Sequence, residues 1–230
     1  MPVKSDQLQA KPFLKWAGGK RQLLDQLESH FPIHLFNGEI SCYVEPFVGS
    51  GALFFRIVQT FPIRECFLAD VNPELILVYK ALQEDVSGLV NQLGSIEERF
   101  LKLDLEQRKD FYYRVRADYN QQRDSVQFYA FEANWILRAA HMLFLNRTGY
   151  NGLFRLNSDG AFNVPFGRYA NPRILDEKNL RRVAELLQDV TIHYGDFEET
   201  ASWVNDHTLV YFDPPYRPLS TTAHFTSYSK

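Results

Sequence analysis

The first half of the chain alternates between short apolar runs and helical patterns, and this alternation limits the possible folds more than any other feature. Cys42 to Phe47 reads as a strand that ends in the glycine-bearing turn Val48-Gly49-Ser50-Gly51, and Ala52 to Thr60 has the spacing of a helix. Glu65 to Ala69 reads as a second strand, and Pro73 opens the next helix in the first-turn position that proline favours. The order predicts an α/β fold with a parallel sheet and helices on its faces.

The alternation returns late in the chain after a long interruption. Residues from about Val86 to Leu145 are mostly helical in pattern, with Gln127 to Leu145 as the clearest helix. Asn146 to Pro172 is rich in Asn, Gly, Arg and aromatic residues and has no long apolar period, and a loop of this length needs a function. Regular elements then resume, with a helix at Asp176 to Leu187 and strands at Val190 to Tyr194 and Leu209 to Phe212.

We therefore expect two sections of one core, residues 1–85 and 176–230, separated by an insertion at residues 86–175. The insertion is the candidate for target recognition. An early helix is also expected, from Lys20 to His30, because Leu23, Leu24 and Leu27 recur at helical spacing.

The composition is that of a globular protein, with 45% hydrophobic and 23% charged residues. The net charge of −3 argues against a nonspecific nucleic-acid binder, although basic residues gather between Arg147 and Arg182. That patch suits either an enzyme that grips DNA on one face or a solvated loop. Cys42 and Cys66 are too few for a disulfide framework. No signal peptide or membrane-length apolar stretch is evident, so we expect a cytoplasmic protein without a membrane partner.

The most informative motif is an apolar run, Leu209 to Phe212, that ends abruptly in Asp213-Pro214-Pro215-Tyr216. Such a strand delivers polar groups to the carboxyl end of a parallel sheet, where open α/β folds bind ligands. Asp213 and a carbonyl near Pro214 can accept both protons of the adenine exocyclic amine, which stabilises positive charge as the nitrogen attacks a methyl group. Tyr216 would stack on the base after it leaves the duplex. The alternative is a proline-rich strand end without a role.

Taken together, these segments resemble the DNA adenine methylases that modify GATC sites, a DNA adenine-N6 methyltransferase family of class alpha. In that class the cofactor motif precedes the recognition insertion and the Asp-Pro-Pro-Tyr element. The resemblance covers essentially the whole chain. It is carried by Lys15–Lys20, Glu45–Gly51, Tyr150–Arg155, Phe162–Tyr169 and the motif that begins at Asp213.

The resemblance implies a Rossmann-like sheet that binds S-adenosylmethionine as the methyl donor. The glycines of Phe47-Val48-Gly49-Ser50-Gly51 would let the cofactor approach the backbone, and Asp70 would accept hydrogen bonds from its ribose. Phe54 stands where a dinucleotide-binding loop has its third glycine, which argues against a dehydrogenase. The other expected cofactor contacts are Trp16, Lys20, Asp196, Phe197 and Asp213.

The same resemblance implies double-stranded DNA as the partner. Arg155 matches the arginine that reads a guanine of GATC, and arginine recognises guanine through two hydrogen bonds. Arg168 is expected to pair with phosphate, which fixes the register without reading sequence. The remaining expected DNA contacts are Tyr150, Asn151, Leu153, Pro165 and Tyr169. No metal is expected, because the six histidines form no ligand-spaced pair with one another or with cysteine.

The sequence ends at Lys230, whereas members of the family continue for further strands and helices. Leu209 to Phe212 has the pattern of an interior strand, so an end here would leave it at an edge. This suggests a truncated chain, or a partner fragment that supplies the C-terminal strands. The sequence leaves open whether adenine methylation would serve restriction–modification, repair or a phage. Two alternatives to adenine methylation itself also stay open. One is amino methylation of cytosine or a protein amide, and the other is an inactive remnant that still binds DNA or cofactor.

Overall fold

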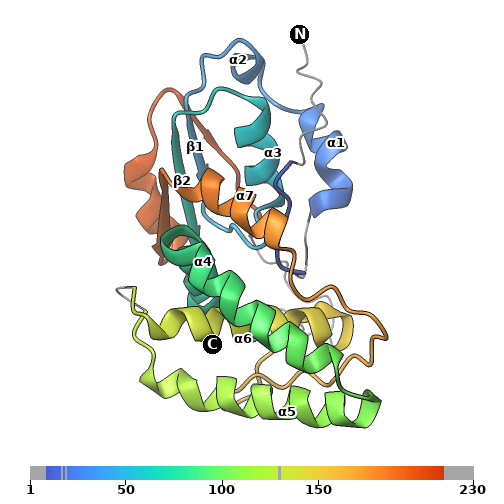
Figure 1. Ribbon diagram of the computed structural model, residues 1–230. Helices are drawn as coiled ribbons and strands as arrows, with labels where there is room; N and C mark the ends of the chain where they lie inside the picture. Colours follow the sequence, from blue (N-terminus) through green and yellow to red (C-terminus); the bar gives the residue numbers. More distant parts are fainter. Residues whose placement is uncertain (1–8, 17, 19, 129–130, 215–230) are drawn as a thin grey trace, which may run out of the picture.

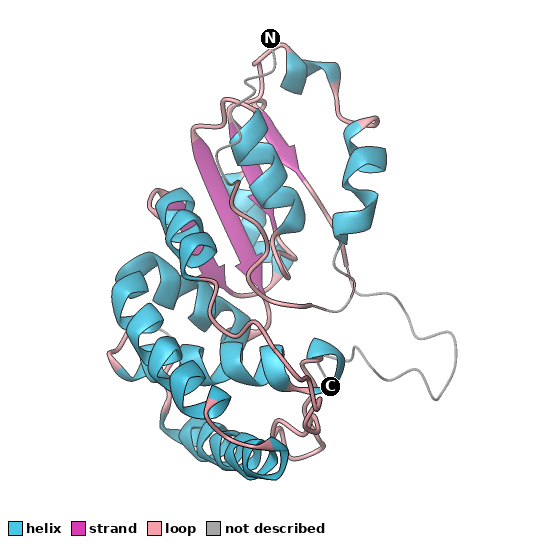
Figure 2. Cartoon of the chain, turned by 45° about the vertical axis from the view of Figure 1, so that its right-hand side comes forward, coloured by secondary structure: helices cyan, strands magenta, loops and turns pink. Residues whose placement is uncertain are grey.

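A computed structural model describes residues 9–16, 18, 20–128 and 131–214. Its sheet has four parallel strands, β1 (Cys42–Glu45), β2 (Glu65–Asp70), β3 (Val190–Tyr194) and β4 (Thr208–Val210), in the spatial order β3-β2-β1-β4. The predicted α/β class with a parallel sheet is therefore confirmed (Figure 2).

The strand order reverses direction between β1 and β4. From β1 the chain adds β2 and then β3 on one side, and it returns to place β4 on the other side of β1. In open α/β sheets, the loops that leave two such neighbouring strands diverge to opposite faces, and ligands bind in the crevice beyond their carboxyl ends. The loop after Glu45 and the segment after Val210 meet at this point.

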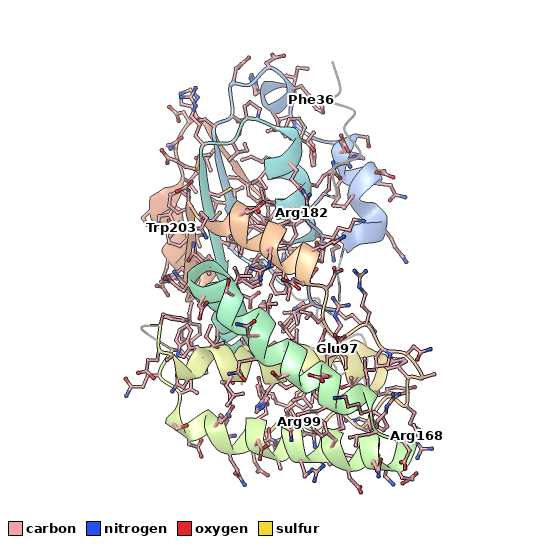
Figure 3. The ribbon with its side chains drawn as sticks, viewed as in Figure 1. Phe36, Glu97, Arg99, Arg168, Arg182 and Trp203 are labelled. Carbon is pink, nitrogen blue, oxygen red and sulfur yellow. The ribbon has the colours of Figure 1, made fainter. Side chains whose placement is uncertain are left out.

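Helices cover both faces of the sheet. The 3₁₀ helix η4 (Phe197–Trp203) lies on one face, where Trp203 stacks on Phe67 of β2 with ring centroids 5.1 Å apart. Cys66 and Leu68 alternate with Phe67 along the strand and are buried on the opposite side. Figures 1 and 3 show η4 with Trp203 on one side of the strands, and α3 (Ala52–Thr60) and α7 (Glu177–Leu187) on the other.

The insertion forms a helical layer against one end of this core (Figure 1). Helix α4 (Pro73–Leu101) runs from the sheet into that layer and leaves helical geometry at Asp85, where φ is −148° and ψ is 71°. Helices α5 (Leu105–Gln122) and α6 (Asn134–Thr148) pack beside it, and aromatic residues dominate their contacts. Phe100 from α4, Phe111 from α5 and Phe144 from α6 form mutual edge-to-face pairs at 5.2–6.0 Å.

Most predicted elements are present, and the differences have local causes. The helix expected at Gln127 begins only at Asn134, and Trp135 Nε1 in its first turn donates to the Gln127 carbonyl at 3.1 Å. It continues to Thr148, whose hydroxyl donates to the Phe144 carbonyl.

The helix expected at Lys20 to His30 is divided into η1 (Lys20–Leu23) and α1 (Leu24–Glu28). Two short helices, α2 (Ile33–Phe36) and η2 (Arg123–Ser125), were not predicted. Among the described residues, β4 pairs with β1 alone, so its side chains are half-buried and Phe212 is 54% exposed. Cys42 and Cys66 are buried free thiols, as expected of cysteines in interior strands.

Candidate active site

The loop after β1 is shaped by glycines in a conformation that other residues rarely adopt. Gly49 and Gly51 have φ values of 49° and 69°. A Cβ on Gly51 would lie 2.5 Å from the hydroxyl of Tyr79, and a Cβ on Gly49 would lie 3.1 Å from Trp16 Cδ1. Tyr79 also donates to the Gly49 carbonyl at 3.2 Å. Tyr79 of α4 and the ring of Trp16 therefore both pack against this loop.

Asp70, at the end of β2, braces the same loop. Its Oδ2 accepts from the Gly49 N–H at 3.1 Å, and its Oδ1 accepts from the Asn72 N–H at 2.9 Å. Burial raises the pKa of the Asp70 carboxyl, while the backbone N–H groups that it accepts from oppose that rise. Asn72 in turn caps α4 by accepting from Glu74 N–H and Leu75 N–H. Asp70 is thus a fixed acidic side chain at the carboxyl end of β2, and its contact with a ribose stays a prediction.

Asp213 lies beyond the carboxyl end of β4 and forms an ion pair with Lys20. Lys20 Nζ approaches its Oδ1 at 3.0 Å, and the two side chains are 14% and 23% exposed. The sequence placed both residues at the site, and the structure brings them into contact. Pro214 follows in exposed, non-repetitive backbone. Pro215 and Tyr216, also expected at the adenine site, lie outside the described residues.

Three phenylalanines gather between the ends of the strands. Phe47 stacks on Phe197 with ring centroids 5.6 Å apart, and Phe212 lies 6.2 Å from Phe47 and 6.3 Å from Phe197. They come from the β1 loop, the start of η4 and the end of β4. Asp196 does not project freely, because it forms a capping box for η4 with Glu199. The cluster offers ring faces suited to a planar ligand, with Phe197 and Phe212 partly exposed.

Glu45 is a buried acid that sequence reasoning did not single out as a site residue. It is 3% exposed, accepts a 2.7 Å hydrogen bond from the Tyr43 hydroxyl, and lies at the last position of β1. Burial raises the pKa of its carboxyl to about 8, and the charges of Asp213 and Asp70 act in the same direction. The sequence feature that could have identified Glu45 is an acidic residue within an otherwise apolar strand. Glu45 is therefore largely protonated at neutral pH, near the partly buried carboxylates of Asp70 and Asp213.

Trp16 connects the glycine loop to the insertion. Besides its contact with Gly49, its ring stacks on Phe154 at 5.4 Å with 27° between the planes. Next to it, the backbone of Lys15 is clamped by the buried side chain of Asn146, which accepts from Lys15 N–H and donates to the carbonyls of Lys15 and Gly152. Asn146 is a second structural residue that sequence reasoning missed, because only the folded chain brings these segments together.

The loop after α6 turns sharply at the positions expected to contact DNA. Tyr150 and Asn151 lie in η3 (Tyr150–Gly152), where Asn151 has a positive φ of 54° and Tyr150 is 53% exposed. The Tyr150 N–H donates to the Pro165 carbonyl, and the Asn151 N–H donates to the Tyr169 hydroxyl. Leu153 is half-buried against the core. The structure therefore brings together four of the predicted contacts, Tyr150, Asn151, Pro165 and Tyr169.

The two arginines of this loop differ in their surroundings. Arg155 is held by Asn163, with Nε donating to the side-chain Oδ1 at 2.7 Å and Nη2 to the backbone carbonyl at 3.2 Å. Such a two-point contact fixes the plane of the guanidinium. Arg168 has a positive φ of 56° and lies at the outer end of the insertion, well away from the sheet (Figure 3). Arg155 is thus an oriented side chain, whereas Arg168 lies at the periphery.

Within the described ranges, no three His, Cys, Asp or Glu residues are grouped as metal ligands. Over the same residues, none of the helices combines the length and the apolar character needed to cross a bilayer.

Comparison with known proteins gives a consistent family. The model of the D12 class N6 adenine-specific DNA methyltransferases matches residues 16–230. Type II methyltransferase M.MjaIII of Methanocaldococcus jannaschii is 47% identical over 97% of this chain and 75% of its own length. Type II methyltransferase M1.LlaDCHI of Lactococcus lactis subsp. cremoris is 34% identical, over 99% and 73%. DNA adenine methylase of Escherichia coli strain K12 is 38% identical, over 95% and 69%.

The names of this family and of these relatives describe methylation of DNA, the reaction that the sequence predicts for this chain. The predicted activity, methylation of adenine N6 in DNA, is confirmed at the level of the family. The predicted resemblance to DNA adenine methylases is confirmed as well. The chain belongs to the D12 class of N6 adenine-specific DNA methyltransferases.

Proposed function

We propose that this protein transfers a methyl group from S-adenosylmethionine to N6 of a flipped-out adenine within GATC. The observation that carries the proposal is the meeting of two strand ends at the reversal of the sheet. The glycine loop after β1 and Asp213 after β4 lie on either side of the crevice where such sheets bind ligands.

The residues present suit the cofactor on physical grounds. Gly49 and Gly51 have positive φ values, and a Cβ on either would meet Trp16 or Tyr79, so only glycine keeps this loop in its tight turn at the strand end where a cofactor would approach the backbone. Asp70 supplies a fixed carboxylate for the ribose hydroxyls, and Phe47 and Phe197 supply ring faces for the adenine ring of the cofactor. Trp16 and Lys20 border the other side of the loop. When bound, the cofactor supplies an electrophilic methyl group on a sulfonium.

Asp213 acts on the acceptor of the methyl group. The lone pair of the adenine amine is delocalised into the ring, so the amine is a weak nucleophile. Asp213 and the carbonyl of Pro214 accept its protons and favour a pyramidal nitrogen whose lone pair faces the methyl group. A bound methyl donor would supply the methyl group, and the Asp213 carboxylate would stabilise the positive charge that develops on the adenine nitrogen. The nitrogen would then give one proton to Asp213, which passes it to solvent, and this restores the neutral amine. Pro215 and Tyr216 would complete the pocket.

The insertion, residues 86–175, is proposed to read the DNA. Arg155 is fixed in plane by Asn163 and can present its remaining N–H donors to guanine O6 and N7. The exposed ring of Tyr150, together with Asn151, Leu153 and Pro165, would fill the space that the flipped adenine leaves. Arg168 and Tyr169 would contact the backbone, and residues 1–85 and 176–230 would form the catalytic core.

The direct test follows transfer of a labelled methyl group from S-adenosylmethionine to duplexes that contain GATC. We expect labelling at adenine N6, and we expect Asp213→Ala to reduce kcat by about 10²–10³-fold, the usual effect of losing an oriented transition-state acceptor. Asp206→Asn is the matched control, because Asp206 is exposed in the turn before β4. Undiminished labelling by Asp213→Ala would refute the proposed role. Binding of DNA and cofactor without any labelling would instead favour an inactive remnant.

A further inference from the structure

The N-terminal segment, residues 9–16, forms no helix or strand and is held by side-chain amides from three helices. Each amide accepts from a backbone N–H of the segment and donates to the carbonyl of the same residue, as a neighbouring strand would do. The three pairs are Gln59 of α3 with Ala10, Asn179 of α7 with Lys11, and Asn146 of α6 with Lys15.

Asn146 also holds a second segment, the loop after α6. Its Oδ1 accepts from the Lys15 N–H at 2.9 Å, and its Nδ2 donates at 2.8 Å to the carbonyls of both Lys15 and Gly152. Both N–H groups of the amide are therefore used, and an acid of the same size could not replace them. The side chain is 3% exposed. One buried amide thus joins two backbone segments that are far apart in the sequence.

The loop beyond Gly152 is fixed to the same N-terminal segment at further points. A Cβ on Gly152 would overlap the side chain of Lys15, so the two residues are packed against each other. The Phe154 ring stacks on Trp16 at 5.4 Å, and Arg155 follows directly in the chain. The place of Arg155 relative to the N-terminal segment therefore depends on these contacts, which begin at Asn146.

We infer that Asn146 is a positioning residue for base recognition, which sets where Arg155 lies relative to the glycine loop. The N-terminal segment reaches that loop through Trp16, whose ring contacts Gly49. The inference rests on the proposed function, in which Arg155 reads a guanine, and extends it to a buried residue that does not touch DNA. A two-point contact with a base requires donors in the correct place, because hydrogen bonds weaken steeply when they are misaligned.

The first test is a double-variant cycle on DNA discrimination. Affinities for a GATC duplex and for a duplex altered at one guanine are measured by fluorescence anisotropy in wild type, Asn146→Asp, Arg155→Ala and the combined variant. Asn146→Asp keeps an acceptor for the Lys15 N–H and loses both donors. We expect it to reduce discrimination by about tenfold. Added to Arg155→Ala it should change discrimination by less than about twofold, because Asn146 acts through Arg155.

Asn179→Asp is the matched control for this cycle. It removes the same donor from the same N-terminal segment, but Asn179 makes its two hydrogen bonds with Lys11, away from the loop after α6. Discrimination should stay within about twofold of wild type, and its effect should add to that of Arg155→Ala. Additive losses for Asn146→Asp and Arg155→Ala would overturn the inference, and so would an equal loss of discrimination in Asn179→Asp.

A measurement without DNA separates the inference from the proposed function. Hydrogen exchange followed by mass spectrometry reports on peptides that cover residues 9–16 and 149–156. Both should exchange faster in Asn146→Asp, whereas only the first should do so in Asn179→Asp. Unchanged exchange in the loop after α6 would overturn the inference.

If the wild-type protein does not discriminate GATC from the altered duplex, the proposed target fails. Hydrogen exchange then still decides whether Asn146 holds the loop. Asn146→Ser, which is neutral and too short to join the two segments, provides a second variant if Asn146→Asp does not fold.

Discussion

At the scale of single residues, the ends of β1, β2 and β4 bring one protonated acid close to two partly buried carboxylates. Glu45 is buried beneath Asp70 and Asp213, and its carboxyl has a pKa of about 8. The Tyr43 hydroxyl, which donates to Glu45 at 2.7 Å, satisfies the buried acid.

The raised pKa makes stability depend on pH in a defined direction. The folded chain keeps the Glu45 proton up to about pH 8, whereas the unfolded chain releases it near 4.5. The free energy of unfolding should therefore fall as pH rises between these values, by at most about 1.4 kcal/mol per unit. Glu45→Gln should flatten this dependence in urea titrations from pH 5 to 9. An equal slope in the variant would show that Glu45 is not the group responsible.

Gly51 provides a second prediction at this scale. Gly51→Ala forces a side chain into a φ of 69° and places Cβ 2.5 Å from the Tyr79 hydroxyl, so we expect a loss of about 1–2 kcal/mol in stability and weaker cofactor binding. Gly94→Ala is the contrasting control. A Cβ there meets only Leu175 Cδ2 at 3.6 Å in the middle of α4, so stability should rise by about 0.5–1 kcal/mol. Thermal unfolding and calorimetry measure both.

At the scale of elements, the shape of the loop after α6 depends on contacts between residues that are distant in the sequence. Asn146 fixes Gly152 to the backbone of Lys15, Phe154 stacks on Trp16, and Gly167 donates to the Thr148 carbonyl. The loop therefore forms against the N-terminal segment and the end of α6, with little regular structure of its own. These contacts and the hydrogen bonds of Asn163 and Pro165 hold Arg155 and Tyr150 in place.

Arg155→Ala tests whether the loop reads a base. We expect the variant to lose about 1–3 kcal/mol of discrimination between GATC and duplexes altered at one guanine, because a two-point contact is lost. Affinity for the cofactor should not change. Arg173→Ala is a matched control, since Arg173 is 73% exposed and pairs with Asp176. Equal loss of affinity for all duplexes would assign Arg155 to phosphate instead.

At the scale of the whole molecule, a buried ion pair ties the insertion to the core. Arg138 of α6 is 1% exposed, and its Nε donates to Glu74 at 2.8 Å while Nη2 donates to the other carboxylate oxygen. Nη1 donates to the Tyr119 carbonyl of α5 at 2.7 Å. Glu74 lies in the first turn of α4, four positions beyond Asp70. The insertion helices are thereby anchored next to the proposed ribose contact.

Breaking this pair should destabilise the protein strongly. Arg138→Met leaves the Glu74 carboxylate buried without a partner, and we expect a loss of about 3–5 kcal/mol in the free energy of unfolding. The double variant Arg138→Met/Glu74→Leu should recover most of that loss, because no charge then stays buried. Urea unfolding of the two single variants and the double variant measures the coupling. Additive losses would show that the contact contributes little.

The sequence by itself determined the elements of the core and much of the site. The apolar strands and the residues that follow them, Gly49-Ser50-Gly51, Asp70 and Asp213, can be recognised from the sequence alone. Glycine at a turn and an acidic residue at a strand end are local properties of the chain. The order of those strands then placed their carboxyl ends at one edge. The predicted start of α6 at Gln127 was wrong, because the apolar spacing of a segment does not show at which residue its helix begins.

Only the tertiary structure decided which of these groups touch. The pairing of Lys20 with Asp213, the clamp by Asn146, and the buried pair of Arg138 with Glu74 join residues that are far apart in the chain. The raised pKa of Glu45 likewise comes from burial beneath two other acids. Desolvation and charge pairing depend on distances through space, which residue types and spacing do not contain. The motif at Asp213 can therefore be read in the sequence, while the pairing of Asp213 with Lys20 is seen only in the fold.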